Sequence, residues 1–173
     1  MPVSSSGSPD VQKNFFEDCQ IGEKTLSPGR TITETDVVFF AAFTGDWLPI
    51  HTNAEYAKQT PFGERIAHGM LVLTVGSALL FRLGDAALLP KATIAPYEVE
   101  RVRFVAPAKI GDTIHTEAEI VRMTELDAAH GLVAIRGEIK NQRAELLAVF
   151  TLKGLAGRRP ASPAGSAGGE RAS

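Results

Sequence analysis

The sequence is poor in cysteine, in long apolar runs and in excess charge of either sign. Its single cysteine, Cys19, excludes an internal disulfide and a zinc site built from several cysteines. No run approaches the roughly 20 apolar residues that a membrane helix needs, and the first residues lack the basic and apolar regions of a signal peptide. A formal net charge of −2 provides no basic surface for nucleic acid or an anionic membrane. We therefore expect a cytoplasmic protein whose partners are small molecules or proteins.

Length and composition indicate one folded domain between two irregular ends. A chain of 173 residues has room for one ordinary domain with a core that is stable without disulfides or metal. Residues 1–12 and 157–173 are rich in small residues and proline, and they hold too little apolar surface to order themselves. We expect both ends to be disordered, which leaves residues 13–156 as the domain.

Capping signals and apolar patterns predict three helices. Thr33 and Asp36 form a capping signature before an apolar run, and Gly45 is placed to end that helix. A short helix fits residues 53–59. The third helix, over about residues 69–83, is apolar on nearly every side, which is typical of a helix buried in the centre of a fold.

Alternation of side chains predicts strands in the rest of the domain. An early strand with an interruption fits residues 24–33, and the later strands are joined by short links, which are typical of antiparallel neighbours. An early strand, one apolar helix and a meander of strands predict an α+β domain with an antiparallel sheet wrapped around the helix, the hot-dog arrangement. The later strands are expected over residues 97–106, 113–122, 132–140 and 145–153.

The segment after the first helix carries an acid and an imidazole. Asp46 and His51 lie five positions apart in a stretch that also contains Gly45 and Pro49, which interrupt regular structure. We therefore interpret the two side chains as placed in a loop rather than packed as core residues of a helix. Because Asp often caps a turn, this pair alone leaves a purely structural role open.

With its continuation, this segment resembles the MaoC-like family of hot-dog dehydratases, which includes the (R)-specific enoyl-CoA hydratases. The likeness covers about residues 15–153. The matching motifs are Thr44-Gly45-Asp46, Pro49-Ile50-His51, Tyr56-Ala57-Lys58, Thr60-Pro61-Phe62-Gly63, Ile66-Ala67-His68-Gly69-Met70-Leu71 and, more weakly, Phe104-Val105-Ala106-Pro107 with Gly111-Asp112.

The resemblance implies a hydro-lyase that interconverts 2-enoyl-CoA and (R)-3-hydroxyacyl-CoA without a cofactor, since coenzyme A is part of the substrate. Asp46 and His51 match residues that hold the added water, one removing a proton and the other helping to deliver a proton to Cα. Gly69 matches a backbone N–H donor to the thioester oxyanion, and Ser77 matches a residue that supports the catalytic acid. The resemblance also implies a homodimer, or a higher oligomer of dimers.

Four neighbours are predicted to contact substrate or shape its site: Trp47, Leu48, Ile50 and His68. His68 has a further interpretation as a residue that orients the turn before Gly69. Its spacing from the other histidines matches no zinc motif, so no metal site is predicted. Leu48 replaces an Asn found in many relatives, and its side chain forms no hydrogen bond.

Two alternatives to a hydratase stay open. Other hot-dog proteins hydrolyse thioesters, so an acyl-CoA thioesterase is one. The substitution at Leu48 motivates the other, an acyl-CoA-binding accessory protein with weak or no turnover. No role is assigned to His115 or His130, nor to the scattered basic residues considered for coenzyme A phosphates: Arg65, Lys91, Arg101, Arg103 and Lys109.

Overall fold

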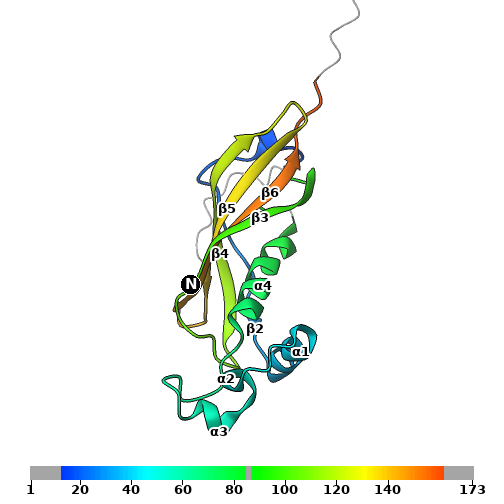
Figure 1. Ribbon diagram of the computed structural model, residues 1–173. Helices are drawn as coiled ribbons and strands as arrows, with labels where there is room; N and C mark the ends of the chain where they lie inside the picture. Colours follow the sequence, from blue (N-terminus) through cyan, green and yellow to red (C-terminus); the bar gives the residue numbers. More distant parts are fainter. Residues whose placement is uncertain (1–12, 85–86, 162–173) are drawn as a thin grey trace, which may run out of the picture.

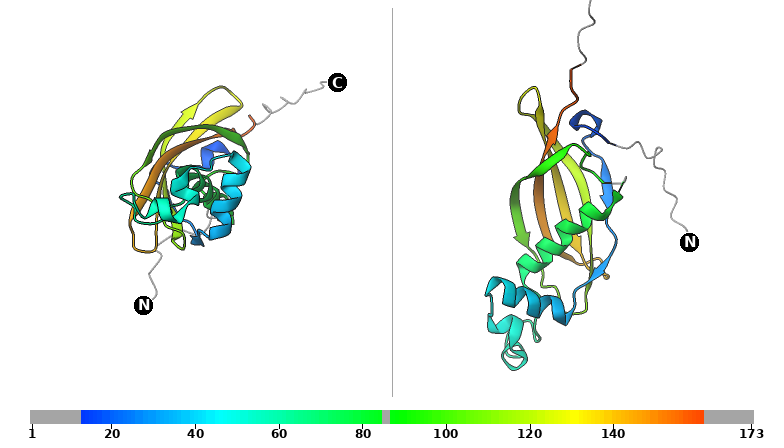
Figure 2. Two further views of the ribbon diagram at one scale, coloured as in Figure 1. Left: turned by 60° about the horizontal axis from the view of Figure 1, so that its bottom comes forward. Right: turned by 90° about the vertical axis from the view of Figure 1, so that its right-hand side faces the viewer.

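An antiparallel sheet curves around one central helix in the computed structural model (Figures 1 and 2). The structure describes residues 13–84 and 87–161, so the predicted disorder of residues 1–12 and 162–173 lies outside it. None of the helices in the described residues is long and apolar enough to cross a membrane. In chain order, the elements are η1 (Phe16–Asp18), β1 (Lys24–Leu26), β2 (Arg30–Thr31), α1 (Glu34–Thr44), α2 (Pro49–Thr52), α3 (Ala54–Ala57), α4 (Gly69–Leu79), η2 (Leu80–Arg82), β3 (Thr93–Phe104), β4 (Thr113–Glu125), β5 (His130–Lys140) and β6 (Leu146–Gly157).

The sheet confirms the predicted α+β class and corrects one strand pairing. Its strand order is β1-β4-β5-β6-β3, with β2 also paired to β4, and each pair is antiparallel. Strands β4, β5 and β6 form the expected meander. The expectation that β3 and β4 are neighbours is wrong, because β3 pairs with β6 at the edge of the sheet. Residues 105–112 are therefore not a tight turn but a segment that carries the chain across one end of the sheet.

Local signals set both ends of α1 and the start of α3 as predicted, whereas α3 ends at Ala57, two residues before the predicted end. The Thr33 hydroxyl accepts the Asp36 N–H at 3.2 Å, and the Asp36 carboxylate accepts the Thr33 N–H at 2.8 Å. Gly45 ends α1 at a φ of 77°, a left-handed conformation that glycine adopts without a steric penalty. The Asn53 side chain caps α3. As a result, α1, α2 and α3 gather at one end of the sheet, beside the start of α4 (Figure 1).

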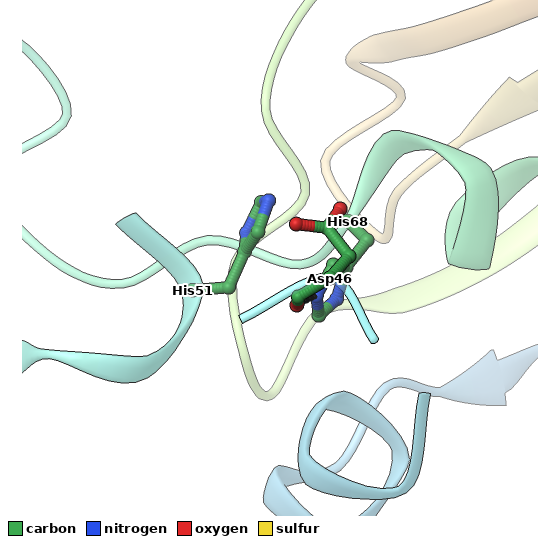
Figure 3. A group of neighbouring side chains, drawn as sticks. All are labelled: Asp46, His51 and His68. Atoms are coloured by element: carbon green, nitrogen blue, oxygen red, sulfur yellow. Dashed lines mark hydrogen bonds between the residues drawn. The ribbon is translucent and has the colours of Figure 1, made fainter. Parts of the chain in front are cut away.

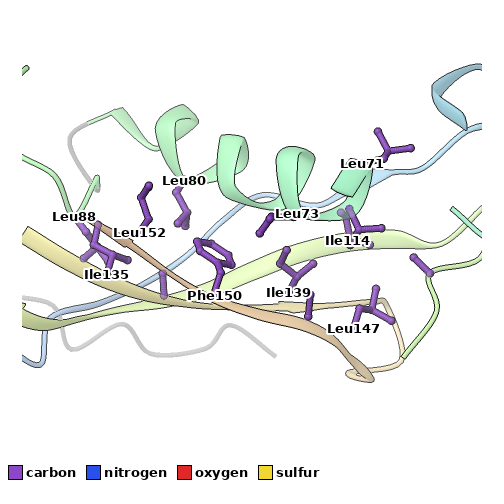
Figure 4. Packing of buried hydrophobic residues seen from close by; sticks show 14 of the residues in the cluster. Leu71, Leu73, Leu80, Leu88, Ile114, Ile135, Ile139, Leu147, Phe150 and Leu152 are labelled. Atoms are coloured by element: carbon purple, nitrogen blue, oxygen red, sulfur yellow. The ribbon is translucent and has the colours of Figure 1, made fainter. Parts of the chain in front are cut away.

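One side of α4 packs on the sheet and supplies the centre of the core (Figure 4). The approach is so close that a side chain at Gly76 would overlap Ile139. At the same point the buried Thr116 hydroxyl donates a hydrogen bond to the Gly76 carbonyl at 2.8 Å. The buried apolar residues around this contact include Leu71, Leu73, Leu80, Ile114, Ile135, Leu147, Phe150 and Leu152.

The opposite side of this helix is not covered by the described chain. Met70, Thr74, Ala78 and, in η2, Phe81 are exposed, and they recur at intervals of about one turn. The prediction that the helix is buried on all sides is therefore wrong for the single chain. The physical reason is that the sheet and helices α1, α2 and α3 cover only part of the circumference of α4.

The ordered chain extends past the predicted domain boundary at residue 156. Strand β6 runs to Gly157, and the next two residues are held by acidic partners. Arg158 reaches Glu17 at 3.0 Å and Glu125 at 2.8 Å, and Arg159 reaches Asp18 at 2.6 Å. Composition did not indicate this order because ion pairs, rather than apolar burial, hold the two arginines.

Asp112 fixes the segment 105–112. Its buried carboxylate accepts hydrogen bonds from the Lys109 N–H and from the Gln142 side chain, both at 2.9 Å, and pairs with Arg143 at 3.1 Å. Burial disfavours the charged form, but these donors outweigh it and hold the pKa of Asp112 below its ordinary value. The segment is thereby fixed where it crosses the end of the sheet.

Asp112→Asn tests this attachment. Because the pKa is lowered in the folded state, the ionised carboxylate stabilises the fold above its unfolded pKa of about 3.9, and this stabilisation is lost as the pH falls through the folded value. Charged hydrogen bonds contribute about 1.5–3 kcal/mol, so urea denaturation at pH 7 should show a loss of that order. The difference from wild type should shrink below about pH 4. An equal difference at both pH values would contradict this account.

Gly76→Ala tests the contact between α4 and the sheet. The added methyl overlaps Ile139, and overpacking of this kind costs roughly 1–3 kcal/mol. Thr74→Ala is the matched control on the exposed side of the same helix and should change stability by about 0.5 kcal/mol or less. Chemical denaturation of both variants measures the difference, and equal stabilities would refute the close packing.

Candidate active site

Three residues predicted for the site lie together at the start of α4 (Figure 3). One carboxylate oxygen of Asp46 and one ring nitrogen each of His51 and His68 all lie within 4.8 Å of one another. Asp46 is on the loop after α1, His51 is on α2, and His68 immediately precedes α4. The side chain of Asp46 is half-buried, whereas His51 and His68 are 8% and 2% exposed. The two imidazoles are therefore largely removed from water.

The short helix α2 was not predicted, and it corrects the interpretation of His51. Pro49 occupies its first turn, where the fixed φ of proline favours a helix start and its missing N–H costs nothing. The His51 N–H donates to the Leu48 carbonyl at 2.9 Å. The expectation that His51 lies in a loop rather than packed in a helix is wrong, because Pro49 begins a helical turn here instead of interrupting one.

A hydrogen bond to the backbone fixes the tautomer of His51. Its Nδ1 lies 2.8 Å from the Ile66 carbonyl oxygen. A carbonyl only accepts, so Nδ1 carries the hydrogen and Nε2 of the neutral ring keeps its lone pair. This arrangement leaves Nε2 available as a base or as a ligand.

His68 is bound to the neighbouring loop in the same way. Its Nε2 donates to the backbone carbonyl of Asp46 at 3.0 Å, and its ring centroid lies 3.9 Å from that of His51. Phe40 contacts the ring from α1, with centroids 5.0 Å apart. Burial lowers the pKa of His68 and favours the neutral ring. Its Nδ1 is buried and has no hydrogen-bond partner among the described residues.

A cavity of about 340 Å³ opens beside His51 and Gly69. Its volume is at the small end of the usual range for ligand pockets, and its lining is mainly apolar. Gly69 is the first residue of α4, whose N-terminus receives no side-chain cap, so its N–H is available to an anionic oxygen. The other lining residues are Phe62, Ile66, Ala67, Val72, Phe104, Val105, Ala106, Pro107, Ala108 and Leu147.

The glycine at position 69 also serves packing. A Cβ placed there would lie 3.1 Å from the ring of Phe104, which belongs to the end of β3. The ring therefore lies tightly against the N-terminus of α4, in space that a side chain at residue 69 would crowd. This contact joins two parts of the cavity wall.

None of the four residues predicted to contact substrate, Trp47, Leu48, Ile50 and His68, lines this cavity. Trp47 and Leu48 are 54% and 58% exposed, and Ile50 is half-buried. The Leu48 N–H lies 3.4 Å from the carboxylate of Asp46, so Leu48 approaches the acid with its backbone. The Leu48 side chain is exposed, so the single chain shows no contact through which the replacement of Asn by Leu would affect the site.

The described chain does not bring Ser77 to the other predicted residues. Its hydroxyl donates to the Thr74 carbonyl at 3.2 Å, within α4. Ser77 lies about 12 Å along the helix from Gly69, at 1.5 Å per residue. Its predicted support of the catalytic acid therefore has no contact in this structure.

Three other residues considered in the sequence, two basic residues and the cysteine, are held by ion pairs or by burial. Arg65, considered for coenzyme A phosphates, donates two hydrogen bonds to Glu34 at 2.8 and 2.7 Å, and Lys109 pairs with Glu64. Burial raises the pKa of the Cys19 thiol to about 11, so this thiol stays protonated at neutral pH. The ion pairs of Arg65 and Lys109 and the burial of Cys19 favour structural roles for these three residues.

Sequence reasoning missed much of the cavity wall. Phe104 to Pro107 form only a weak motif in the sequence, Ala108 belongs to none, and Phe62 belongs to another motif with no role assigned. Alternation of side chains predicts a strand at β3 but contains no information on what its end contacts. Leu147 lies at the start of β6 and had no distinguishing signal.

Together the fold and site define a hot-dog domain with an acid and two histidines beside an apolar cavity. Residues 17–141 match the family described as MaoC like domain, and the chain belongs to this family. The (R)-specific enoyl-CoA hydratase of Rhodospirillum rubrum is 35% identical over 138 residues, which cover 75% of this chain and 91% of that protein. The 3-hydroxybutyryl-CoA dehydratase of Methylorubrum extorquens is 36% identical over 115 residues, 66% of this chain and 69% of that protein.

A third relative is much longer than the match. Protein MaoC of Klebsiella aerogenes is 38% identical over 112 residues, 65% of this chain, but the match spans 32% of that protein. The chain therefore corresponds to about a third of this relative. The names of the other two relatives are those of hydro-lyases.

Solved structures agree with the fold. A monoamine oxidase regulatory protein from Archaeoglobus superposes with a TM-score of 0.81 at 39% identity, covering 87% of this chain and 99% of that one. The unliganded R-hydratase PhaJ1 of Pseudomonas aeruginosa gives 0.65 at 29% identity, covering 91% and 99%. The Mycobacterium tuberculosis protein RV0216, described as a double hot-dog fold, gives 0.69 at 20% identity, which shows the fold alone.

Proposed function

We propose that this protein is a hydratase–dehydratase that interconverts a 2-enoyl-CoA and the corresponding (R)-3-hydroxyacyl-CoA. One observation carries the proposal. The carboxylate of Asp46 and the Nε2 lone pair of His51 lie close together beside a cavity that His51 and Gly69 both line. This is the arrangement that addition of water to an activated double bond requires, with an acid–base pair on one side and a donor to the carbonyl oxygen on the other.

The reaction begins with a water molecule between Asp46 and His51. The pair removes one proton from the water, and the oxygen adds to Cβ of the enoyl thioester. The pair then returns a proton to Cα, so one molecule of water is added across the double bond. Elimination is the same sequence reversed. Because the Nδ1 hydrogen of His51 is committed to Ile66, Nε2 is the ring nitrogen that exchanges protons.

Negative charge develops on the thioester oxygen during this addition. The N–H of Gly69 points from the N-terminus of α4, where the helix dipole and unpaired N–H groups favour an anion. Preorganised donors of this kind stabilise an oxyanion more in the transition state than in the ground state. The apolar cavity wall accommodates the acyl chain, and coenzyme A belongs to the substrate, so this mechanism uses no separate cofactor.

Hydration of crotonyl-CoA tests the proposal, through the loss of enoyl absorbance. Acid–base groups contribute roughly 10² to 10⁴ in rate, so Asp46→Asn and His51→Gln should each lower kcat by a factor in that range. His130→Gln is the matched control. His130 begins β5 and pairs with Asp127 in the preceding turn, so its substitution should not affect turnover. Undiminished turnover in both site variants would reject the mechanism.

The two alternatives are distinguished in the same samples. A thioesterase would release free thiol, which a thiol reagent detects, whereas hydration leaves the thioester intact. An accessory protein would bind acyl-CoA without turnover. In that case Leu48→Asn should restore hydration if the substitution at this position caused the loss. In an active enzyme we expect Leu48→Asn to change turnover far less than Asp46→Asn, because the Leu48 side chain is exposed and outside the cavity wall.

We also propose that the protein is a homodimer joined through β3 and the uncovered side of α4. Strand β3 is an edge of the sheet, and the unpaired backbone groups of a long edge strand are a template for pairing with another chain. Apolar residues are exposed on β3 and on the uncovered side of α4 and η2, and exposed apolar side chains that lie together mark interaction sites. These exposed residues are Met70, Phe81, Ile94, Tyr97, Val99 and Val102.

Val99→Glu tests this interface. A charge in the centre of a buried edge is costly to desolvate, so sedimentation or light scattering should show a shift from dimer to monomer. Leu126→Glu is the matched control, because Leu126 is exposed in the turn between β4 and β5. A wild-type monomer, or a Val99→Glu variant that stays dimeric, would refute the interface.

A further inference from the structure

We propose that His68 is a positioning residue, which ties the loop of Asp46 and the ring of His51 to the start of α4 (Figure 3). The inference rests on the proposed function, because it concerns the geometry that this reaction needs. His68 does not line the cavity, so its influence on the reaction passes through the residues that it contacts.

The loop that carries Asp46 depends on His68 for its attachment to α4. Nε2 of His68 donates to the Asp46 carbonyl at 3.0 Å, across 22 residues of chain. Among the described residues, the other hydrogen bonds of residues 45–48 stay within residues 41–52. Those of Asp46 itself are long, at 3.3 Å to the Thr44 hydroxyl and 3.4 Å from the Leu48 N–H. The bond from His68 therefore sets where Asp46 lies relative to the start of α4.

The ring of His68 also restricts the ring of His51. The two ring centroids lie 3.9 Å apart, with an angle of 31° between the ring planes. The hydrogen bond from Nδ1 of His51 to the Ile66 carbonyl fixes one edge of the His51 ring. Contact with His68 limits rotation of the ring about that bond. The direction of the catalytic Nε2 thus depends on both contacts.

His68 is itself held firmly enough to position its neighbours. Its side chain is buried, and the ring of Phe40 packs on it from α1, with centroids 5.0 Å apart. A catalytic group is held precisely when the residues that support it have their own conformations fixed by packing. Gly69, the proposed oxyanion donor, directly follows His68 in the chain. One residue therefore connects the acid, the base and the donor.

The environment of His68 favours a ring that stays neutral throughout the reaction. Burial lowers the pKa of His68, although the hydrogen bond to the Asp46 carbonyl acts in the opposite direction. Protonation would add a hydrogen to Nδ1, which is buried and has no acceptor among the described residues. A neutral His68 places no positive charge beside His51, where it would oppose the uptake of a proton. His68 thus holds the pair in place without exchanging protons itself.

Two substitutions separate the hydrogen bond of His68 from its bulk. His68→Phe keeps a flat ring but donates no hydrogen bond, and it should lower kcat by about 10²-fold, the cost of displacing a reacting group by about 1 Å. His68→Gln should recover most of that loss, because its amide nitrogen is as many bonds from Cα as Nε2 is and also donates. KM for crotonyl-CoA should change little in both variants, since His68 does not line the cavity. Circular dichroism and chemical denaturation check that both are folded.

His115→Gln is the matched control. His115 is on β4, where it pairs with Glu117 at 3.8 Å, so its substitution should leave kcat unchanged. The pH profile of kcat/KM should keep its wild-type shape in His68→Gln, because a positioning residue exchanges no proton. A missing limb in that profile would overturn the inference. Wild-type kcat in His68→Phe, equal losses of kcat in the two His68 variants, or an effect on KM alone would also overturn it.

The attachment is measured without catalysis by nuclear magnetic resonance of the imidazole nitrogens in the wild-type chain. At neutral pH His68 should be a neutral ring with its hydrogen on Nε2. A hydrogen on Nδ1, or a charged ring, would overturn the attachment. If the wild type hydrates no enoyl-CoA at all, the proposed function fails and the catalytic part of this inference fails with it, while the nitrogen resonances still decide whether His68 holds the loop of Asp46.

Discussion

The close packing of α4 on the sheet is the constraint on which the site depends. Gly76 lets the helix approach until Ile139 fills the space that a side chain would occupy, and Thr116 bonds to the helix backbone at the same point. This contact fixes the axis of α4 and hence the position of Gly69 at its start. The chain then needs only to bring the acid and the imidazoles to that end, which α1 and α2 do.

The backbone, more than other side chains, sets the chemistry of the two histidines. Ile66 and Asp46 each contribute a carbonyl oxygen, so the protonated nitrogen of each ring is determined by the fold. The bond to Ile66 leaves Nε2 of His51 free for the proton transfer proposed above.

The uncovered surfaces of the chain have a common origin. The sheet ends at β3, whose outer edge has no partner in the described chain, and α4 is covered on one side only. Both surfaces carry exposed apolar side chains. The proposed homodimer covers both surfaces, and in it the apolar helix is buried on the side that the single chain leaves open.

Much of the fold was predictable because its signals are local. The capping pair of Thr33 and Asp36, the helix end at Gly45 and the alternation of β4, β5 and β6 each act over a few residues. The site was predictable in part for a different reason, since Asp46, His51 and Gly69 were recognised as motif residues. The short helix α2 was missed because Pro49 both interrupts and begins helices, and only the surrounding structure decides between them.

By itself, the sequence determined the α+β class, the apolar central helix and the presence of an acid, an imidazole and a glycine that match a family of hydratases. Only the tertiary structure decided that β3 pairs with β6, that Phe104 closes the cavity against Gly69, and that His68 lies against His51. These facts depend on contacts between residues far apart in the chain. No local pattern contains them, because they follow from how the segment 105–112 and the start of α4 meet at one end of the sheet.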